Sequence, residues 1–556
     1  MSIAELAPVV SEATRGRAAR PWRWPWYVAA ACQAVYVATA VWVLYGLPYE
    51  IGDALARSAD ARYMLFSRDP HLAAVGFVWL PLPVLAQLPF MLVLSPLHQA
   101  VAAGPLSTTV AGALTIVVVA SICRTLGLGR RMSLAVTLAY GLNPIIVFTA
   151  ANGMSEAWFY LFASIALLGY LRWFLDRRMN DVAILAVGLA GAMAVRYETL
   201  AFVPLLALGA GVAGTRGRWR TSTFKGTGAR FASIFATASL PAGYVLGTWL
   251  FASLLIMKDP FFWAHAQATM GHTPPHAGWL PSHLTDASIV GYSARLTLEL
   301  APGLVVLGPL SLVVGRRSLD RMVVGVCLLS CALLFPLLIV FQLISRTTWA
   351  DPRYFEPCIL FTTVATAWVA SNLHLGGLRS TRVAYLLLVS ILVLGAATGT
   401  LALSNPNATA IEQEHHFFRA ISLQRDVTQG QVNTFQLAPV IPSWHRLATD
   451  LDSTTHSHDH ILIDANVSFP AFVFTRHPRR YVVSSDRDFQ SIVADPAGKV
   501  DYIVQVPGSP LSAQFAQILA DSTNGAWHLE GQYSVASVYK LVPSSLRAPV
   551  TPIPGG

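Results

Sequence analysis

The stretch PYEIGDALARSADARYMLFSRDPHLAAVGFVWLPLP, residues 48–83, is polar in its first half although apolar segments flank it on both sides. It carries three carboxylates that could take part in a reaction, Glu50, Asp53 and Asp60, in a chain of which only 12% of residues are charged. Its spacing of apolar residues predicts an amphipathic helix that lies on a membrane surface. Trp79 and several prolines follow, where the chain becomes apolar again. This pattern indicates a carboxylate-bearing loop at a bilayer interface.

The composition outside this stretch indicates a membrane protein. Of 556 residues 54% are hydrophobic, and long apolar runs recur from Trp26 to Leu403. A helix of about 20 apolar residues spans a bilayer, and continuous rather than alternating runs favour helices over a β-barrel. We therefore expect an α-helical polytopic domain of about 10–12 membrane segments at residues 26–403, after a basic tail at residues 1–25. Whether residues 72–95 cross the membrane or only re-enter it is left open.

The last part of the chain, residues 404–556, is polar and mixed in composition. Its short apolar runs alternate between strand-like and helix-like spacing, which predicts a small α/β domain. Two of these runs, residues 527–533 and 537–542, are expected to close the domain as a hairpin. We find no glycine-rich phosphate loop in it.

Arginines gather in the short loops between apolar runs, and the positive-inside rule places these loops in the cytoplasm. The net charge of +9 is therefore not a nucleic-acid signal. We expect a multi-pass protein of the cell (plasma) membrane with a cytoplasmic N-terminus and an extracytoplasmic C-terminal domain. Residues 48–71 and 258–300 become external loops. Residues 181–214 begin and end at basic loops, so they are expected to form a helical hairpin with its tip near the outer face.

Four external segments bring charged residues to one face in this topology. The first loop supplies Glu50, Asp53 and Asp60, the second turn Glu156, the hairpin tip Arg196 and Glu198, and the late turn Arg353 and Tyr354. A carboxylate can take the proton of an acceptor hydroxyl, and arginine binds phosphate through two parallel hydrogen bonds. The segments together suit group transfer from a lipid-linked phosphate. Of the four histidines in the 258–300 loop, only His272 and His276 have the spacing of a tight metal-ligand pair, and two prolines lie between them. A divalent metal is therefore possible but unsupported, and no cofactor is expected.

The arrangement of these residues along the chain resembles that of the GT-C class of membrane glycosyltransferases. The similarity rests on an Asp after the first membrane helix (Asp53), a Trp-x-Pro-Leu-Pro motif at residues 79–83, Asn-Gly-Met-Ser-Glu at residues 152–156, and the arginines Arg196 and Arg353. It is nearest to the polyprenyl- or dolichyl-phosphate-sugar group that includes protein O-mannosyltransferases and lipid A aminoarabinose transferases.

The resemblance implies a role for each residue. Asp53 would be the catalytic base, with Asp60 and Glu50 as rivals because the chain lacks an adjacent acidic pair. Arg196, Arg353 and Tyr354 would bind the donor phosphate, and Trp79, Glu156 and Glu198 the rest of the substrate. The activity would be inverting sugar transfer from a polyprenyl-phosphate donor to a glycan, lipid or protein hydroxyl. A secondary transporter and a non-catalytic scaffold subunit of the cell envelope remain as alternatives.

Overall fold

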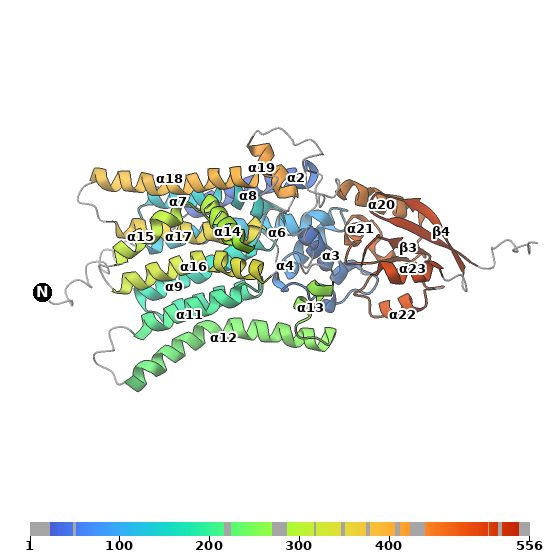
Figure 1. Cartoon of the computed structure of the whole chain (residues 1–556), viewed down its shortest axis with the longest axis horizontal. Helices are drawn as coiled ribbons and strands as arrows, with labels where there is room; N and C mark the ends of the chain where they lie inside the picture. Colours follow the sequence, from blue (N-terminus) through green and yellow to red (C-terminus); the bar gives the residue numbers. More distant parts are fainter. Residues whose placement is uncertain are drawn as a thin grey trace, which may run out of the picture.

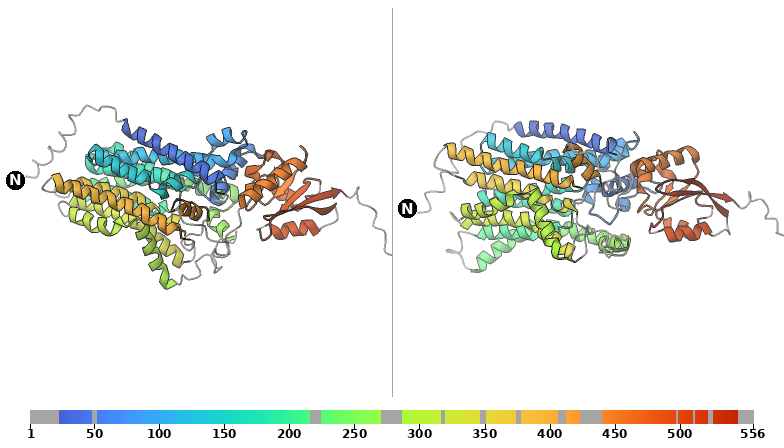
Figure 2. Two further views of the ribbon diagram at one scale, coloured as in Figure 1. Left: turned by 90° about the horizontal axis from the view of Figure 1, so that it is seen from above. Right: turned by 45° about the horizontal axis from the view of Figure 1, so that its top comes forward.

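The computed structural model consists of a bundle of roughly parallel helices with an α/β domain at one end (Figures 1 and 2). It describes residues 23–47, 52–215, 224–269, 286–315, 319–345, 351–373, 378–405, 412–422, 440–496, 498–509, 511–520 and 525–543. A single large cluster of buried apolar side chains runs through the bundle, and a second one continues from the bundle into the α/β domain.

Six helices of the described chain are long and apolar enough to cross a membrane. They are α2 (Trp24–Tyr45), α6 (Ala103–Thr125), α9 (Glu156–Asp176), α12 (Phe224–Met257), α16 (Leu319–Ile344) and α18 (Leu378–Leu403). Two bent pairs would raise the number to eight: α7 (Arg130–Gly141) with α8 (Pro144–Ala151), bent by 59°, and α14 (Asp286–Leu300) with α15 (Gly303–Gly315), bent by 85°. The prediction of a polytopic helical domain is confirmed.

The segment left open, residues 72–95, does not form a span. It folds as a 3₁₀ turn η2 (Leu72–Val75) and two short helices, α4 (Leu82–Leu85) and α5 (Leu88–Leu94). The stretch Leu82–Leu94 that holds both helices has thirteen residues and covers about 20 Å, which is well short of the ~30 Å hydrocarbon core. The backbone N–H of Leu82 donates to the carbonyl of Ala194, 3.1 Å away, and so ties this segment to the hairpin tip.

The predicted hairpin is present as α10 (Met179–Met193) and α11 (Thr199–Thr215), with Arg196 and Glu198 at its tip. α10 lies very close to α9, because each helix places a glycine against the backbone of the other. A Cβ on Gly169 would stand 2.3 Å from the amide nitrogen of Leu185, and one on Gly188 would stand 2.3 Å from that of Ala166. Small residues permit such close approach of membrane helices. The tip is thereby fixed beside the start of α9.

Part of the expected external loop 258–300 is helical instead. It contains α13 (Phe262–Thr269) and α14 (Asp286–Leu300), and α14 packs against α16 and α18. A further helix, α17 (Pro357–Asn372), is buried along nearly its whole length. Beyond α18, the helix α19 (Glu412–Ile421) returns to the bundle, where Phe417 contacts Trp42 and Phe148 at ring-centroid distances of 5.3 and 4.9 Å.

The α/β domain has a five-stranded sheet of order β2-β1-β3-β5-β4. β1 (Ile461–Ile463) pairs in parallel with β2 (Tyr481–Val482) and β3 (Tyr502–Gln505), whereas β4 (Gly525–Gln532) and β5 (Ser537–Pro543) form the predicted antiparallel hairpin. The helices of the domain are α20 (Val440–Thr454), α21 (Phe469–Phe474), α22 (Phe489–Ala494) and α23 (Ser512–Ala520). The central strands are buried on both faces, as parallel strands covered by helices should be.

The helix α3 (Gly52–Phe66) lies between the bundle and the α/β domain (Figure 1). The sequence predicted this helix correctly, but protein rather than lipid covers much of its surface. Nine of its fifteen residues are buried, including Arg57 and Arg62. Arg62 donates to the carbonyl oxygens of Phe472, Val473 and Thr475 at the end of α21. α3, which carries Asp53 in its first turn, therefore connects the α/β domain to the membrane domain.

Candidate active site

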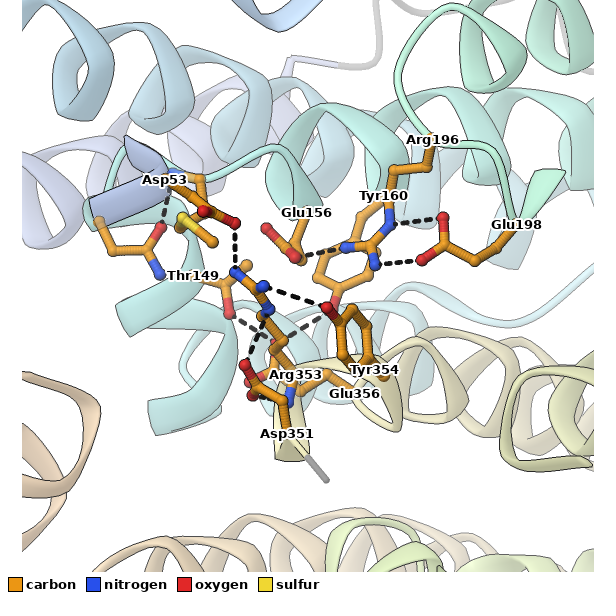
Figure 3. Close-up of polar contacts among 12 residues, drawn as sticks. Asp53, Thr149, Glu156, Tyr160, Arg196, Glu198, Asp351, Arg353, Tyr354 and Glu356 are labelled. Carbon is orange, nitrogen blue, oxygen red and sulfur yellow. Dashed lines mark hydrogen bonds and ion pairs between the residues drawn. The ribbon is translucent and has the colours of Figure 1, made fainter. Parts of the chain in front are cut away.

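Three of the four predicted charged segments converge on the turn η4 (Pro352–Tyr354), which itself is the fourth (Figure 3). Asp53 comes from the first turn of α3, Glu156 from the start of α9, and Arg196 and Glu198 from the tip between α10 and α11. The turn forms because the side chain of Asp351 accepts a hydrogen bond from the backbone N–H of Arg353, 3.0 Å away. It ends at Tyr354, and α17 begins shortly after it at Pro357.

Arg353 is held by two carboxylates and one phenol. Its Nη1 lies 3.0 Å from Oδ2 of Asp53, and its Nε lies 2.9 Å from Oδ2 of Asp351. Its Nη2 donates to the hydroxyl of Tyr354 at 3.1 Å. Burial raises the pKa of Asp351, and the neighbouring guanidinium of Arg353 partly offsets that rise. Asp53 and Arg353 are 300 positions apart in the chain, so this contact exists only because of the tertiary fold.

Arg196 is likewise held by two carboxylates. Glu198 receives two hydrogen bonds, at 2.6 Å from Nη2 and 3.3 Å from Nε, and Glu156 pairs with Nη1. Burial acts to raise the pKa of Glu198, but Arg196 outweighs it and holds that pKa below its usual range. The ring of Tyr354 lies under both arginines, with guanidinium-to-centroid distances of 5.6 Å for Arg196 and 5.0 Å for Arg353.

A small cavity opens beside these residues. Its lining consists of Phe148, Thr149, Asn152, Met154, Glu156, Arg353, Glu356 and Glu414. Within it, one oxygen of Glu356 accepts hydrogen bonds from Thr149 at 3.0 Å and from Tyr160 at 3.1 Å. The lining thus combines three carboxylates with one arginine, two neutral polar side chains and two apolar side chains. Among the residues that the structure describes, no group of three or more His, Cys, Asp or Glu side chains is placed to hold a metal ion.

The other predicted site residues lie at different places. Trp79 stands against Arg57 of α3, with the guanidinium carbon 4.6 Å from the ring centroid. Asp60 lies two turns beyond Asp53 on α3, close to Gly76, and burial raises its pKa well above the usual range. Glu50 lies outside the described residues, as do three histidines of the 258–300 loop: His272, His276 and His283.

The sequence did not predict a site role for Arg57, Thr149, Tyr160 or Glu414. The signal for Arg57 was present, because it lies four residues after Asp53 in a helical pattern and therefore on the same face. Thr149 and Tyr160 sit inside apolar runs and resemble ordinary helix residues. Glu414 had no signal, because nothing in the sequence indicates that α19 returns to the bundle.

No protein-family model and no curated protein sequence matches the chain. Among solved structures, ArnT from Cupriavidus metallidurans bound to undecaprenyl phosphate is similar, with 13% identity, a TM-score of 0.55, and coverage of 94% of this chain and 99% of that one. Its apo state gives 14% identity, a TM-score of 0.53, and coverage of 94% and 100%. The chain shares the fold of ArnT. The fold that the resemblance to GT-C glycosyltransferases implied is thereby confirmed across the membrane domain and the C-terminal domain together.

Proposed function

We propose that this protein is a membrane glycosyltransferase of the ArnT-like GT-C type. It transfers a sugar from a polyprenyl-phosphate donor to the hydroxyl group of an external glycan, lipid or protein, with inversion at the anomeric carbon. The observation that carries the proposal is the contact of Asp53 with Arg353, which joins a candidate base to a candidate phosphate ligand in an ArnT-like fold. The solved ArnT complex, with undecaprenyl phosphate bound, supports a lipid-phosphate donor.

The residues suggest the following chemistry. Asp53 takes the proton of the acceptor hydroxyl as its oxygen attacks the anomeric carbon. The bond from that carbon to the phosphate oxygen breaks, and the polyprenyl phosphate leaves with the electron pair. Arg353 and Arg196 stabilise the negative charge that develops on the phosphate. Because both guanidinium groups already hold carboxylates, the phosphate has to share or replace these partners.

The distribution of charge supports an extracytoplasmic site. Glu156 begins α9 at the site, and the other end of α9 lies about 30 Å away along the helix axis, given 1.5 Å per residue. At that far end Arg172 contacts Thr125 at the end of α6, close in sequence to Arg124 and Arg177. The positive-inside rule assigns this arginine-bearing end to the cytoplasm, and the site and the α/β domain to the opposite side.

Transfer by the purified protein tests the proposal. The wild type in nanodiscs would be incubated with a panel of radiolabelled polyprenyl-phosphate sugars and a crude envelope acceptor, with and without a chelator. Asp53→Asn should lower turnover at least ~100-fold, as expected for loss of a general base. Asp69→Asn is the matched control, because Asp69 belongs to the same external segment but contacts Arg487 of the α/β domain instead.

Turnover that survives in Asp53→Asn would transfer the role of base to Asp60 or Glu50. Absence of turnover with every donor, in a well-folded preparation, would contradict the proposed activity.

A further inference from the structure

Arg57 differs from the two other arginines of the site in its partners. It is buried, with only 4% of its surface exposed. Its Nη1 donates to the backbone oxygen of Asp53 at 3.1 Å and approaches the sulfur of Met154 at 3.8 Å. Its Nε has no hydrogen-bond partner. Across the described chain, no carboxylate stands within ion-pairing distance of its guanidinium, whereas Arg196 and Arg353 each have two.

A buried charge without a partner is costly. Transfer of an ion from water into a protein interior costs several kcal/mol unless a counter-charge offsets it. Burial lowers the pKa of Arg57; Asp53 and Glu156 counteract this, whereas Arg353 and Arg196 lower it further. Asp60 on the same helix is also near, but burial raises its own pKa, which makes it a weak counter-ion. The free protein therefore holds an arginine whose charge is incompletely neutralised.

The position of Arg57 indicates which anion can neutralise its charge. Its Nη1 donates to the backbone oxygen of Asp53, the proposed base, whose carboxylate contacts Arg353. The indole of Trp79 supports its guanidinium at 4.6 Å, so the planar group is held in one orientation. An anion here displaces no carboxylate, whereas at Arg196 or Arg353 it competes with two. Arginine presents a planar fork that matches the oxygens of a phosphate group.

We infer that Arg57 is the residue that receives the phosphate of the lipid-linked donor, and that it binds the same phosphate after the sugar has left. This assignment rests on the proposed function for the identity of the donor, but it concerns lipid-phosphate binding and can be tested without any transfer. Arg353 and Arg196 then act on the charge that develops during the reaction, while Arg57 supplies the initial affinity.

The test compares binding of polyprenyl monophosphate, which carries no sugar, with binding of the uncharged polyprenol. Wild type should bind the phosphate form more tightly than the alcohol. In Arg57→Met this preference should fall by about 10- to 100-fold, as expected for loss of hydrogen bonds to a charged group. The preference of Arg57→Lys should lie between those of wild type and Arg57→Met, because lysine keeps the charge but lacks the planar fork. Arg68→Lys is the matched control on the α/β-domain side, where Arg68 binds Asp486.

Thermal stability separates ligand binding from a structural role. Replacing even a buried ion pair by apolar side chains of similar size is often neutral or stabilising, and a buried charge without a partner has less attraction to lose. The lipid-free Arg57→Met protein should therefore unfold at the same temperature as wild type or higher, and should lose the upward shift that polyprenyl monophosphate gives to wild type. Inorganic phosphate should give wild type a smaller shift than the lipid does, if the lipid headgroup is the physiological anion.

Two results would overturn the assignment. One is an Arg57→Met protein that keeps its preference for the phosphate form. The other is a marked loss of stability in Arg57→Met without lipid, which would show that Arg57 serves the fold. These outcomes are independent of transfer: a wild type that binds polyprenyl monophosphate through Arg57 and turns over no donor would refute the proposed function alone.

Discussion

The junction between α3 and the α/β domain offers the most quantitative prediction. Arg62 is 1% exposed and makes four hydrogen bonds, to Ser95 and to the carbonyl oxygens of Phe472, Val473 and Thr475. In Arg62→Lys the charge remains, but a single ammonium group replaces a planar fork. We expect about two of the four bonds to be lost at ~1.5 kcal/mol each, or about 3 kcal/mol in total.

The assay is hydrogen–deuterium exchange of residues 469–475 in nanodiscs. If these amides exchange when the α/β domain separates locally from α3, a loss of 3 kcal/mol corresponds to roughly 100-fold less protection. Arg487→Ala is the control. Arg487 lies at the same junction, but its side chain is largely exposed and its ion pair with Asp69 is long, at 3.5 Å. A surface pair of this kind should change protection very little.

Equal, small changes in exchange in Arg62→Lys and Arg487→Ala would refute this role of Arg62. Extra exchange in Arg62→Lys that spread evenly through the bundle would also refute it, because the lost bonds are all local to α21 and α5.

Three further predictions concern the site and its support. Gly76→Ala should destabilise the protein by at least ~1 kcal/mol, because Gly76 has φ +74° and an added Cβ would lie 2.9 Å from a carboxylate oxygen of Asp60. Thermal unfolding would measure this loss of stability. Burial raises the pKa of Asp60, so the folded protein favours the protonated carboxyl. The stability that this preference gives is complete below the unfolded pKa of about 4, and it is lost as the pH rises toward the folded pKa. The unfolding temperature of Asp60→Asn minus that of wild type should therefore be more positive at pH 8 than at pH 4, and a difference independent of pH would contradict this. Arg353→Lys should lower kcat by about 100-fold in the transfer assay, because lysine lacks the planar fork of the guanidinium group. The affinity for polyprenyl monophosphate should change little. An unchanged kcat would exclude Arg353 from transition-state stabilisation.

The sequence was sufficient to predict the class of fold, because the patterns that indicate it lie within short segments of the chain. Runs of about 20 apolar residues indicate membrane helices wherever they occur, and the strand-like and helix-like spacing after residue 404 predicted an α/β domain with the hairpin of β4 and β5. The two short apolar arms around Arg196 and Glu198 likewise predicted the hairpin. Segments whose length or polarity is intermediate, such as residues 72–95 and 286–300, could not be assigned from sequence.

The sequence could name charged residues of the site but not pair them. It placed Asp53, Glu156, Arg196 and Arg353 on one face, because charges are scarce in a membrane protein and each is conspicuous. It could not show that Arg196 and Arg353 are neutralised while Arg57 is not. Pairing depends on which side chains meet across helices up to 300 positions apart, and the packing of the bundle decides this. The return of α19, which brings Glu414 to the cavity, depends on the same packing.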